Sequence, residues 1–108
     1  IYMNTVFIAD DELIIRQGLK CIIDWNALGF EVIGEAANGE DALQFITKNN
    51  PDMVMLDIRM PKLTGLDVVK QAREHGYKGK VITAECKIRY LPQRKEYYHY
   101  TNRSIWMK

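Results

Sequence analysis

Four polar side chains stand where short apolar runs of this 108-residue chain end: Asp10, Asp11, Asp57 and Thr83. Continuous apolar runs are typical of strands buried in a parallel sheet. In open α/β sheets, ligands bind at the carboxyl ends of such strands. Three carboxylates gathered there repel one another unless a cation lies between them, and hard oxygen ligands favour ions such as Mg2+. The pattern therefore predicts a metal-assisted phosphate site.

Each of these residues has a chemical role in such a site. The carboxylate of Asp57 is the candidate nucleophile, because a carboxylate can attack phosphorus and form an acyl phosphate. Phosphoryl transfer needs in-line positioning and neutralisation of charge. We expect Asp10 and Asp11 to hold Mg2+ beside Asp57, together with the backbone carbonyl of Arg59. The hydroxyl of Thr83 is placed to donate to a phosphoryl oxygen.

The elements that position these residues follow from the alternation of apolar patterns. Four apolar runs predict strands, at Thr5–Ala9, Phe30–Ala36, Met53–Leu56 and Lys80–Thr83. The three segments between them carry apolar residues at helical spacing. Alternating strands and helices imply βαβ units, a parallel sheet and right-handed crossovers that place helices on both faces. The predicted class is therefore an α/β, doubly wound parallel sheet.

The first helical segment begins at Glu12 and has one apolar face. That face is expected to be buried, and it consists of Ile14, Ile15, Gly18, Leu19, Ile22 and Ile23. Asp10 and Asp11 precede it, and acidic groups also suit a helix N-terminus. Helix capping therefore stays open as a second interpretation of these two residues.

Composition limits the class of protein. Hydrophobic residues make up 47% of the chain, enough for a packed core in one domain. No apolar stretch reaches membrane-spanning length, and no signal peptide is visible, so no membrane partner is expected. Cys21 and Cys86 lack metal-ligand spacing and suggest reduced thiols in a cytoplasmic protein.

Charge divides the chain near residue 78. Residues 1–77 contain seven basic and twelve acidic residues, whereas residues 78–108 contain eight basic and two acidic ones. Five of the eleven aromatic residues also lie after residue 84. Residues 3–84 are therefore expected to form the domain core, and residues 85–108 an atypical C-terminal segment. A basic, aromatic segment can bind nucleic acid, but no recognisable binding module accompanies this one.

At this point the chain resembles the receiver domain of two-component response regulators, a CheY-like domain. The matching motifs are Val6-Phe-Ile-Ala-Asp-Asp-Glu12, Asn38-Gly-Glu-Asp-Ala-Leu43 and Leu56-Asp-Ile-Arg-Met-Pro61 with Gly65. The sequence Ile23-Asp-Trp25, with Leu28-Gly-Phe-Glu-Val-Ile-Gly-Glu35, is similar to that of receivers fused to AraC-type DNA-binding domains. The resemblance implies a flavodoxin-like sheet of strand order 2-1-3-4-5.

The resemblance also implies a function in transcription regulation. Asp57 would accept a phosphoryl group from a sensor histidine kinase, Asp10 and Asp11 would bind Mg2+, and Thr83 would be the switch hydroxyl. The domain would not be an enzyme in the usual sense, although it would support its own phosphorylation and dephosphorylation. DNA would be contacted only through an output domain that is absent from this chain.

The C-terminal third departs from the family pattern. Receivers carry a Lys-Pro pair at the end of the fifth strand, and no Lys-Pro follows residue 84 here. The fifth strand and the last helices are therefore expected to be altered or missing. Because an uncovered strand edge pairs with other chains, we expect a homodimer, a domain swap, or a segment 85–108 that serves as substitute edge or dimerisation element.

The same residues allow two other functional interpretations. A receiver-like interaction or dimerisation module that cannot switch is the alternative, and the missing Lys favours it. An aspartate-nucleophile phosphatase is disfavoured, because Arg59 stands two residues after Asp57, where that chemistry needs a general acid.

Overall fold

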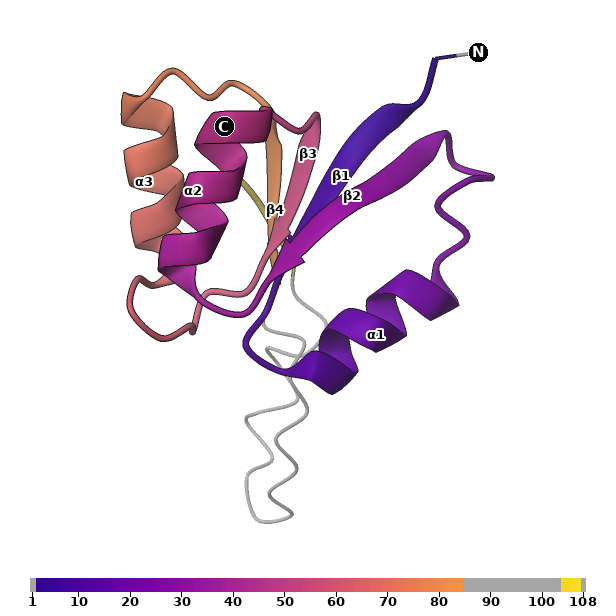
Figure 1. Ribbon diagram of the computed structural model, residues 1–108, viewed down its shortest axis with the longest axis horizontal. Coiled ribbons are helices and arrows are strands. Elements are labelled where there is room, and N and C mark those ends of the chain that lie inside the picture. The colour runs from indigo at the N-terminus through magenta and orange to yellow at the C-terminus, as the bar shows by residue number, and fades with distance from the viewer. Residues whose placement is uncertain (1, 85–103, 108) are drawn as a thin grey trace.

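The computed structural model describes residues 2–84 and 104–107, and its centre is a five-stranded sheet (Figure 1). The strand order is β2-β1-β3-β4-β5, which confirms the predicted order. The strands are β1 (Asn4–Ala9), β2 (Phe30–Ala36), β3 (Met53–Leu56), β4 (Lys80–Ala84) and β5 (Ser104–Met107). The helices are α1 (Leu13–Ile22), α2 (Gly39–Asn49) and α3 (Gly65–Glu74). The first four strands are parallel, as the alternation of patterns predicted.

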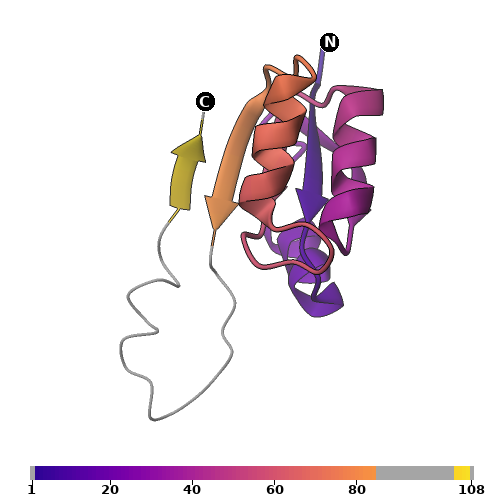
Figure 2. The same ribbon diagram turned by 90° about the vertical axis from the view of Figure 1, so that its left-hand side faces the viewer.

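The fifth strand runs in the opposite direction. β5 pairs antiparallel with β4, so that Ala84 lies opposite Ser104 and Val81 opposite Met107 (Figure 2). This agrees with the expectation that the fifth strand would be altered. The proposed boundary at residue 84 stays a prediction, because residues 85–103 lie outside the described part of the chain.

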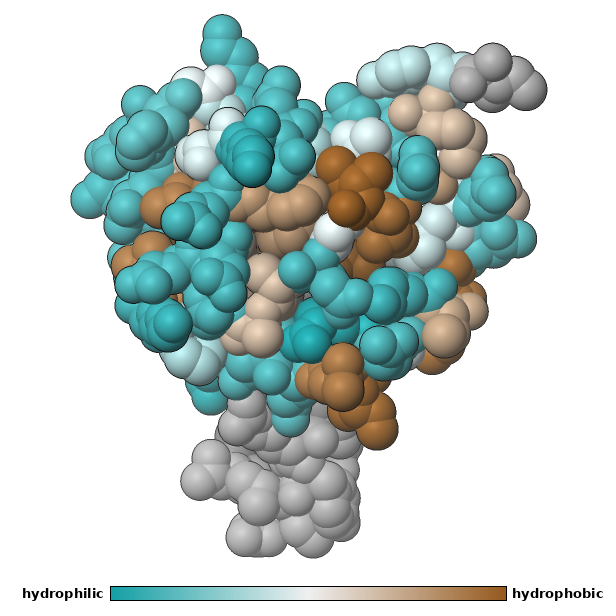
Figure 3. All heavy atoms as spheres, in the orientation of Figure 1, coloured by the Kyte–Doolittle hydropathy of each residue, from teal (hydrophilic) through white to brown (hydrophobic). Residues whose placement is uncertain are grey.

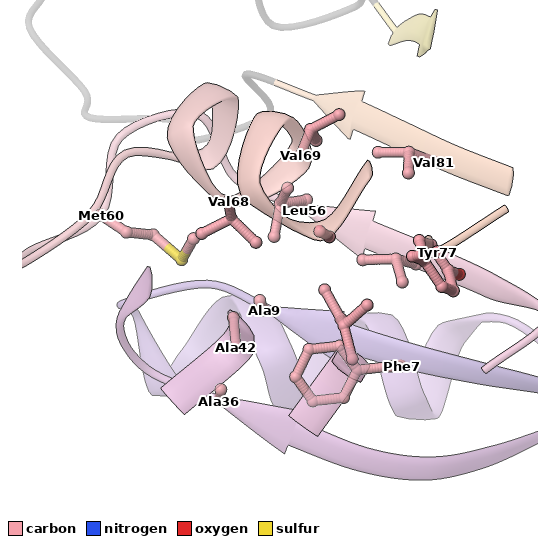
Figure 4. Packing of buried hydrophobic residues seen from close by; sticks show 13 residues of the cluster. Phe7, Ala9, Ala36, Ala42, Leu56, Met60, Val68, Val69, Tyr77 and Val81 are labelled. Atoms are coloured by element: carbon pink, nitrogen blue, oxygen red, sulfur yellow. The ribbon is translucent and has the colours of Figure 1, made fainter. Parts of the chain in front are cut away.

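One face of the sheet is covered by α2 and α3, which lie side by side (Figure 1). Alternate strand residues point to this face, and the core that they form with the two helices is the larger of the two clusters. Figure 4 shows Phe7, Leu56 and Val68 directed toward one another between strands and helix. Each of these three side chains is at most 3% exposed.

Side-chain caps fix where α2 and α3 begin. The side chain of Asn38 accepts a hydrogen bond from the Asp41 amide at 2.8 Å and thereby caps α2. Thr64 caps α3 in the same way through the Asp67 amide at 3.2 Å. Both helices therefore begin at the carboxyl edge of the sheet, where the candidate site lies.

The opposite face of the sheet carries α1 and a smaller cluster. Its buried members are Val6, Ile8, Trp25 and Met53. The expectation of a buried face on the first helix holds only in part: Leu19 and Ile23 pack against this cluster, but no residue of α1 is buried, and Ile14 and Ile22 are 79% and 84% exposed. Apolar atoms are visible at the surface over this helix in Figure 3. The physical reason is that burial of an apolar stripe needs a second element on the same face, and α1 is the only helix that the described residues place there.

Among residues 2–84 and 104–107, the structure has no helix of the length and apolar character needed to cross a membrane.

Candidate functional site

The register of the parallel strands brings the candidate residues to one edge. Ala9 of β1 lies opposite Leu56 of β3, and Leu56 lies opposite Thr83 of β4. Asp10 and Asp57 are the next residues along their strands, so both leave the sheet at the same level. The amide of Asp57 donates to the carbonyl of Ala9 at 2.9 Å, which continues the pairing to this point.

Three consecutive carboxylates form the acidic centre of this edge. Carboxylate oxygens of Asp10, Asp11 and Glu12 lie within 4.8 Å of one another. Asp10 is 3% exposed, and its Oδ1 accepts a hydrogen bond from the Glu12 amide at 2.9 Å. Glu12 was missed as a site residue, although its position directly after Asp11 was the available signal. Hard carboxylate oxygens are suitable ligands for a Mg2+-like ion. The ion in turn would offset the repulsion between the carboxylates.

Asp57 stands beside this centre rather than within it. It is 3% exposed, although carboxylates are rarely buried to this extent. Its Oδ1 accepts a hydrogen bond from the amide of Arg59 at 3.2 Å. The side chain is thereby held at the start of the loop between β3 and α3. The backbone carbonyl of Arg59 as a metal ligand stays a prediction.

Thr83 is fully buried on β4. It follows Val81, a member of the core on the side of α2 and α3, and alternation puts both residues on that face. The structure thus places Thr83 on the strand next to Asp57, one pairing position below it. Its role as a switch hydroxyl stays a prediction.

The loop that follows Asp57 is held by two glycines. The amide of Gly65 donates to the Ile58 carbonyl at 2.8 Å, and the amide of Gly39 donates to the Pro61 carbonyl at 3.1 Å. A Cβ at Gly65 would lie 2.3 Å from the carbonyl oxygen of Asp57. Such a distance is impossible without movement of the backbone. The close packing of this loop therefore depends on the absence of a side chain at this position.

An ion-pair network joins α1 to the acidic end of the sheet. Arg16 Nε donates to Glu35 Oε1 at 2.7 Å, and Arg16 Nη1 donates to the backbone carbonyl of Asp10 at 2.6 Å. Lys20 pairs with the second oxygen of Glu35. Hydrogen bonds from Lys20 and then from Arg16 hold the pKa of Glu35 below its ordinary value. Sequence reasoning missed Arg16, whose partners come from two different strands.

Comparison with known proteins agrees with this geometry. Residues 6–93 match the family model described as "Response regulator receiver domain". The transcriptional regulatory protein YdfI of Bacillus subtilis is 42% identical over 72 residues, which cover 67% of this chain and 33% of that protein. HptR of Staphylococcus aureus, also a transcriptional regulatory protein, is 46% identical over 67 residues, 62% of this chain and 27% of that protein. The chain thus aligns with about a third or less of these curated relatives.

Solved structures show the same fold. The receiver domain of AraT, a response regulator from Geobacillus stearothermophilus, is 37% identical with a TM-score of 0.68, and the match covers 88% of this chain and 75% of that one. A CheX–CheY–BeF3–Mg2+ complex from Borrelia burgdorferi gives 30% identity and a TM-score of 0.70, over 82% and 66% of the two chains. The motifs, the strand order and the acidic edge of the sheet agree with these comparisons. This chain belongs to the response regulator receiver domain family, a family of signalling domains.

Proposed function

We propose that this receiver accepts a phosphoryl group on Asp57 with the help of Mg2+. The observation that carries the proposal is the placement of a buried Asp57 beside three clustered carboxylates at one sheet edge. Further support comes from the similar CheY of Borrelia burgdorferi, which was solved in a complex with CheX, BeF3 and Mg2+. The proposed metal ligands on this chain are Asp10, Asp11, Asp57 and the backbone carbonyl of Arg59.

The chain's own residues would perform most of the chemistry. An oxygen of the Asp57 carboxylate forms the bond to phosphorus as the bond from phosphorus to the donor breaks. Asp10 and Asp11 would hold the ion, which would neutralise the phosphoryl charge. The Thr83 hydroxyl follows the phosphoryl oxygen and shifts the domain between two conformational populations.

The donor and the output belong to the same proposal. A sensor histidine kinase is the proposed donor, and the proposed location is the cytoplasm. DNA would be contacted only through an output domain outside this chain, in line with the names of the curated relatives as transcriptional regulators. We propose a phosphoacceptor that is not an enzyme in the usual sense and that supports its own phosphorylation and dephosphorylation.

Intact mass after incubation with acetyl phosphate and Mg2+ tests the proposal. We expect an added phosphoryl group on the parent protein and none on Asp57→Asn, which keeps the shape of the side chain but removes the nucleophile. The adduct should also disappear when Mg2+ is chelated. An unmodified parent that is folded by circular dichroism would contradict the proposal.

A non-switching interaction module is the second candidate, and the exposed apolar surface of α1 favours it. Ile14 and Ile22 are more than three-quarters exposed, and large exposed side chains of this kind can serve as contact surfaces. A homodimer or a domain swap would be the corresponding assembly. Light scattering tests both assemblies, because a monomer at every concentration would exclude both.

A further inference from the structure

We infer that Arg16 is a positioning residue for the acidic centre, and this inference rests on the proposed function. Its guanidinium donates to the backbone carbonyl of Asp10, within the acidic turn, and is itself held by Glu35. It thereby sets the geometry in which the three carboxylates receive a divalent ion.

The contact is well placed for this role. The carbonyl of Asp10 belongs to the same turn as the carboxylates of Asp10, Asp11 and Glu12. Arg16 Nη1 lies 2.6 Å from that carbonyl, and the Arg16 side chain is only 13% exposed. A hydrogen bond from a charged donor in a largely buried position is among the stronger ones. The peptide that follows Asp10 is therefore restrained in orientation, and with it the direction of the Asp11 side chain.

The fork of an arginine is needed because two acceptors are served at once. Nε reaches Glu35 on the edge strand β2, and Nη1 reaches the end of β1. Glu35 is in turn held by Lys20, one turn further along α1. A lysine at position 16 would keep the charge but would present a single nitrogen on a flexible stem, which cannot reproduce this planar, two-acceptor contact.

The neighbouring Lys20 offers a matched control. It is also a cation on α1, and it also pairs with Glu35, but it contacts Glu35 Oε2 and not the Asp10 turn. Lys20→Gln and Arg16→Gln change the net charge by the same amount. A difference between them therefore measures position rather than total charge.

The test is a titration of the full chain with MgCl2, in which the NMR chemical shift of the Glu12 amide reports Mg2+ binding. Substitution of a residue that hydrogen-bonds and orients metal ligands typically lowers metal affinity by about 10-fold or more. We expect Arg16→Gln to weaken Mg2+ binding by about 10-fold, and Lys20→Gln to stay close to the parent. Arg16→Lys should remain nearer to Arg16→Gln than to the parent.

A metal-free measurement provides the second readout. The Glu12 amide donates to Asp10 Oδ1, so its hydrogen exchange reports on the turn itself. Exchange at Glu12 should accelerate in Arg16→Gln without Mg2+ and stay near the parent rate in Lys20→Gln. If Arg16→Gln does not fold, Glu35→Gln takes its place, with weakened Mg2+ binding expected because the anchor of Arg16 is lost.

The outcomes separate this inference from the proposed function. A parent that shows no saturable Mg2+ shift would overturn the proposed function and this inference with it. A parent that binds Mg2+ while Arg16→Gln binds equally well would overturn the inference alone. Equal losses in Arg16→Gln and Lys20→Gln, or full recovery in Arg16→Lys, would overturn the inference alone, because the affinity would then not depend on the two-acceptor contact of Arg16.

Discussion

The rings of Phe7 and Phe45 are stacked, with centroids 4.3 Å apart and planes 10° from parallel. Phe7 comes from β1 and Phe45 from α2. A Cβ at Gly34, on β2, would lie only 2.5 Å from the ring of Phe45. The missing side chain at Gly34 of β2 therefore leaves the space that the Phe45 ring of α2 occupies.

Gly34→Ala should consequently destabilise the fold. The new methyl group would displace the Phe45 ring from Phe7, and overpacking of this kind costs about 1–3 kcal/mol in the free energy of unfolding. Gly18→Ala is the control, because its nearest neighbour is Ile22 Cδ1 at 4.0 Å. That change should stabilise α1 by about 0.5–1 kcal/mol. Urea unfolding measures both, and equal effects at the two positions would contradict the argument.

Gly65→Ala should damage the site as well as the fold. The added Cβ would collide with the carbonyl of Asp57, so the loop that holds this carboxylate must move. We expect slower phosphorylation by acetyl phosphate and a loss of more than about 1 kcal/mol of stability. Mass spectrometry and urea unfolding provide the two readouts. Phosphorylation at the parental rate would show that the position of the Asp57 backbone does not depend on this contact.

Tyr77→Phe should remove a buried hydrogen bond and a pH dependence together. The Tyr77 hydroxyl donates to the Pro51 carbonyl at 2.6 Å and is 5% exposed as a residue. Loss of this bond leaves a buried acceptor unpaired and costs about 1–3 kcal/mol at neutral pH. Tyr2→Phe is the control, since Tyr2 is 77% exposed.

The pH dependence has a definite sign. Burial raises the pKa of Tyr77 to about 12, whereas the unfolded chain loses this proton near the ordinary tyrosine pKa of 10.0. The folded state therefore binds the proton more tightly, and the contribution to stability is complete below pH 10 and is lost as pH rises through 12. The parent should lose about 2 kcal/mol from this group by pH 12. The same pH dependence in Tyr77→Phe would assign it to other groups.

Ile14→Ala and Ile46→Ala compare one substitution on two helices. Ile46 is 2% exposed on α2, and its truncation should cost about 2–5 kcal/mol. Ile14 is 79% exposed on α1, so the same change should lie within about 0.5 kcal/mol of the parent. Thermal or urea unfolding of dilute protein measures both. A large loss at Ile14 would mean that a second element or a second molecule covers α1 in solution.

Much of the fold was predictable from local pattern. β2 and β3 have the predicted bounds, although β3 is a buried central strand and β2 is a partly exposed edge strand. The strand order required the family resemblance, since apolar runs carry no information on which strands are adjacent. The exposure of Ile14 could not be predicted, because an apolar stripe shows what a helix can bury and not whether anything lies opposite.

The candidate site was predictable in part for a similar reason. Asp10, Asp11 and Asp57 could be predicted from the sequence because they come just after apolar runs. Thr83 could be predicted because it is the last residue of such a run. Arg16 was not, because its two acceptors lie on different strands and no spacing in the sequence connects them.

The reversed direction of β5 determines where probes can be attached. β5 ends opposite Val81, near the amino end of β4, so Met107 lies at the same end of the molecule as Tyr2 (Figure 2). The acidic centre lies at the other end of the strands. A donor and an acceptor dye attached at positions 2 and 107 would thus lie at one end of the folded protein and on average farther apart in the unfolded one. Such a pair would follow unfolding by energy transfer without touching the residues proposed to bind Mg2+.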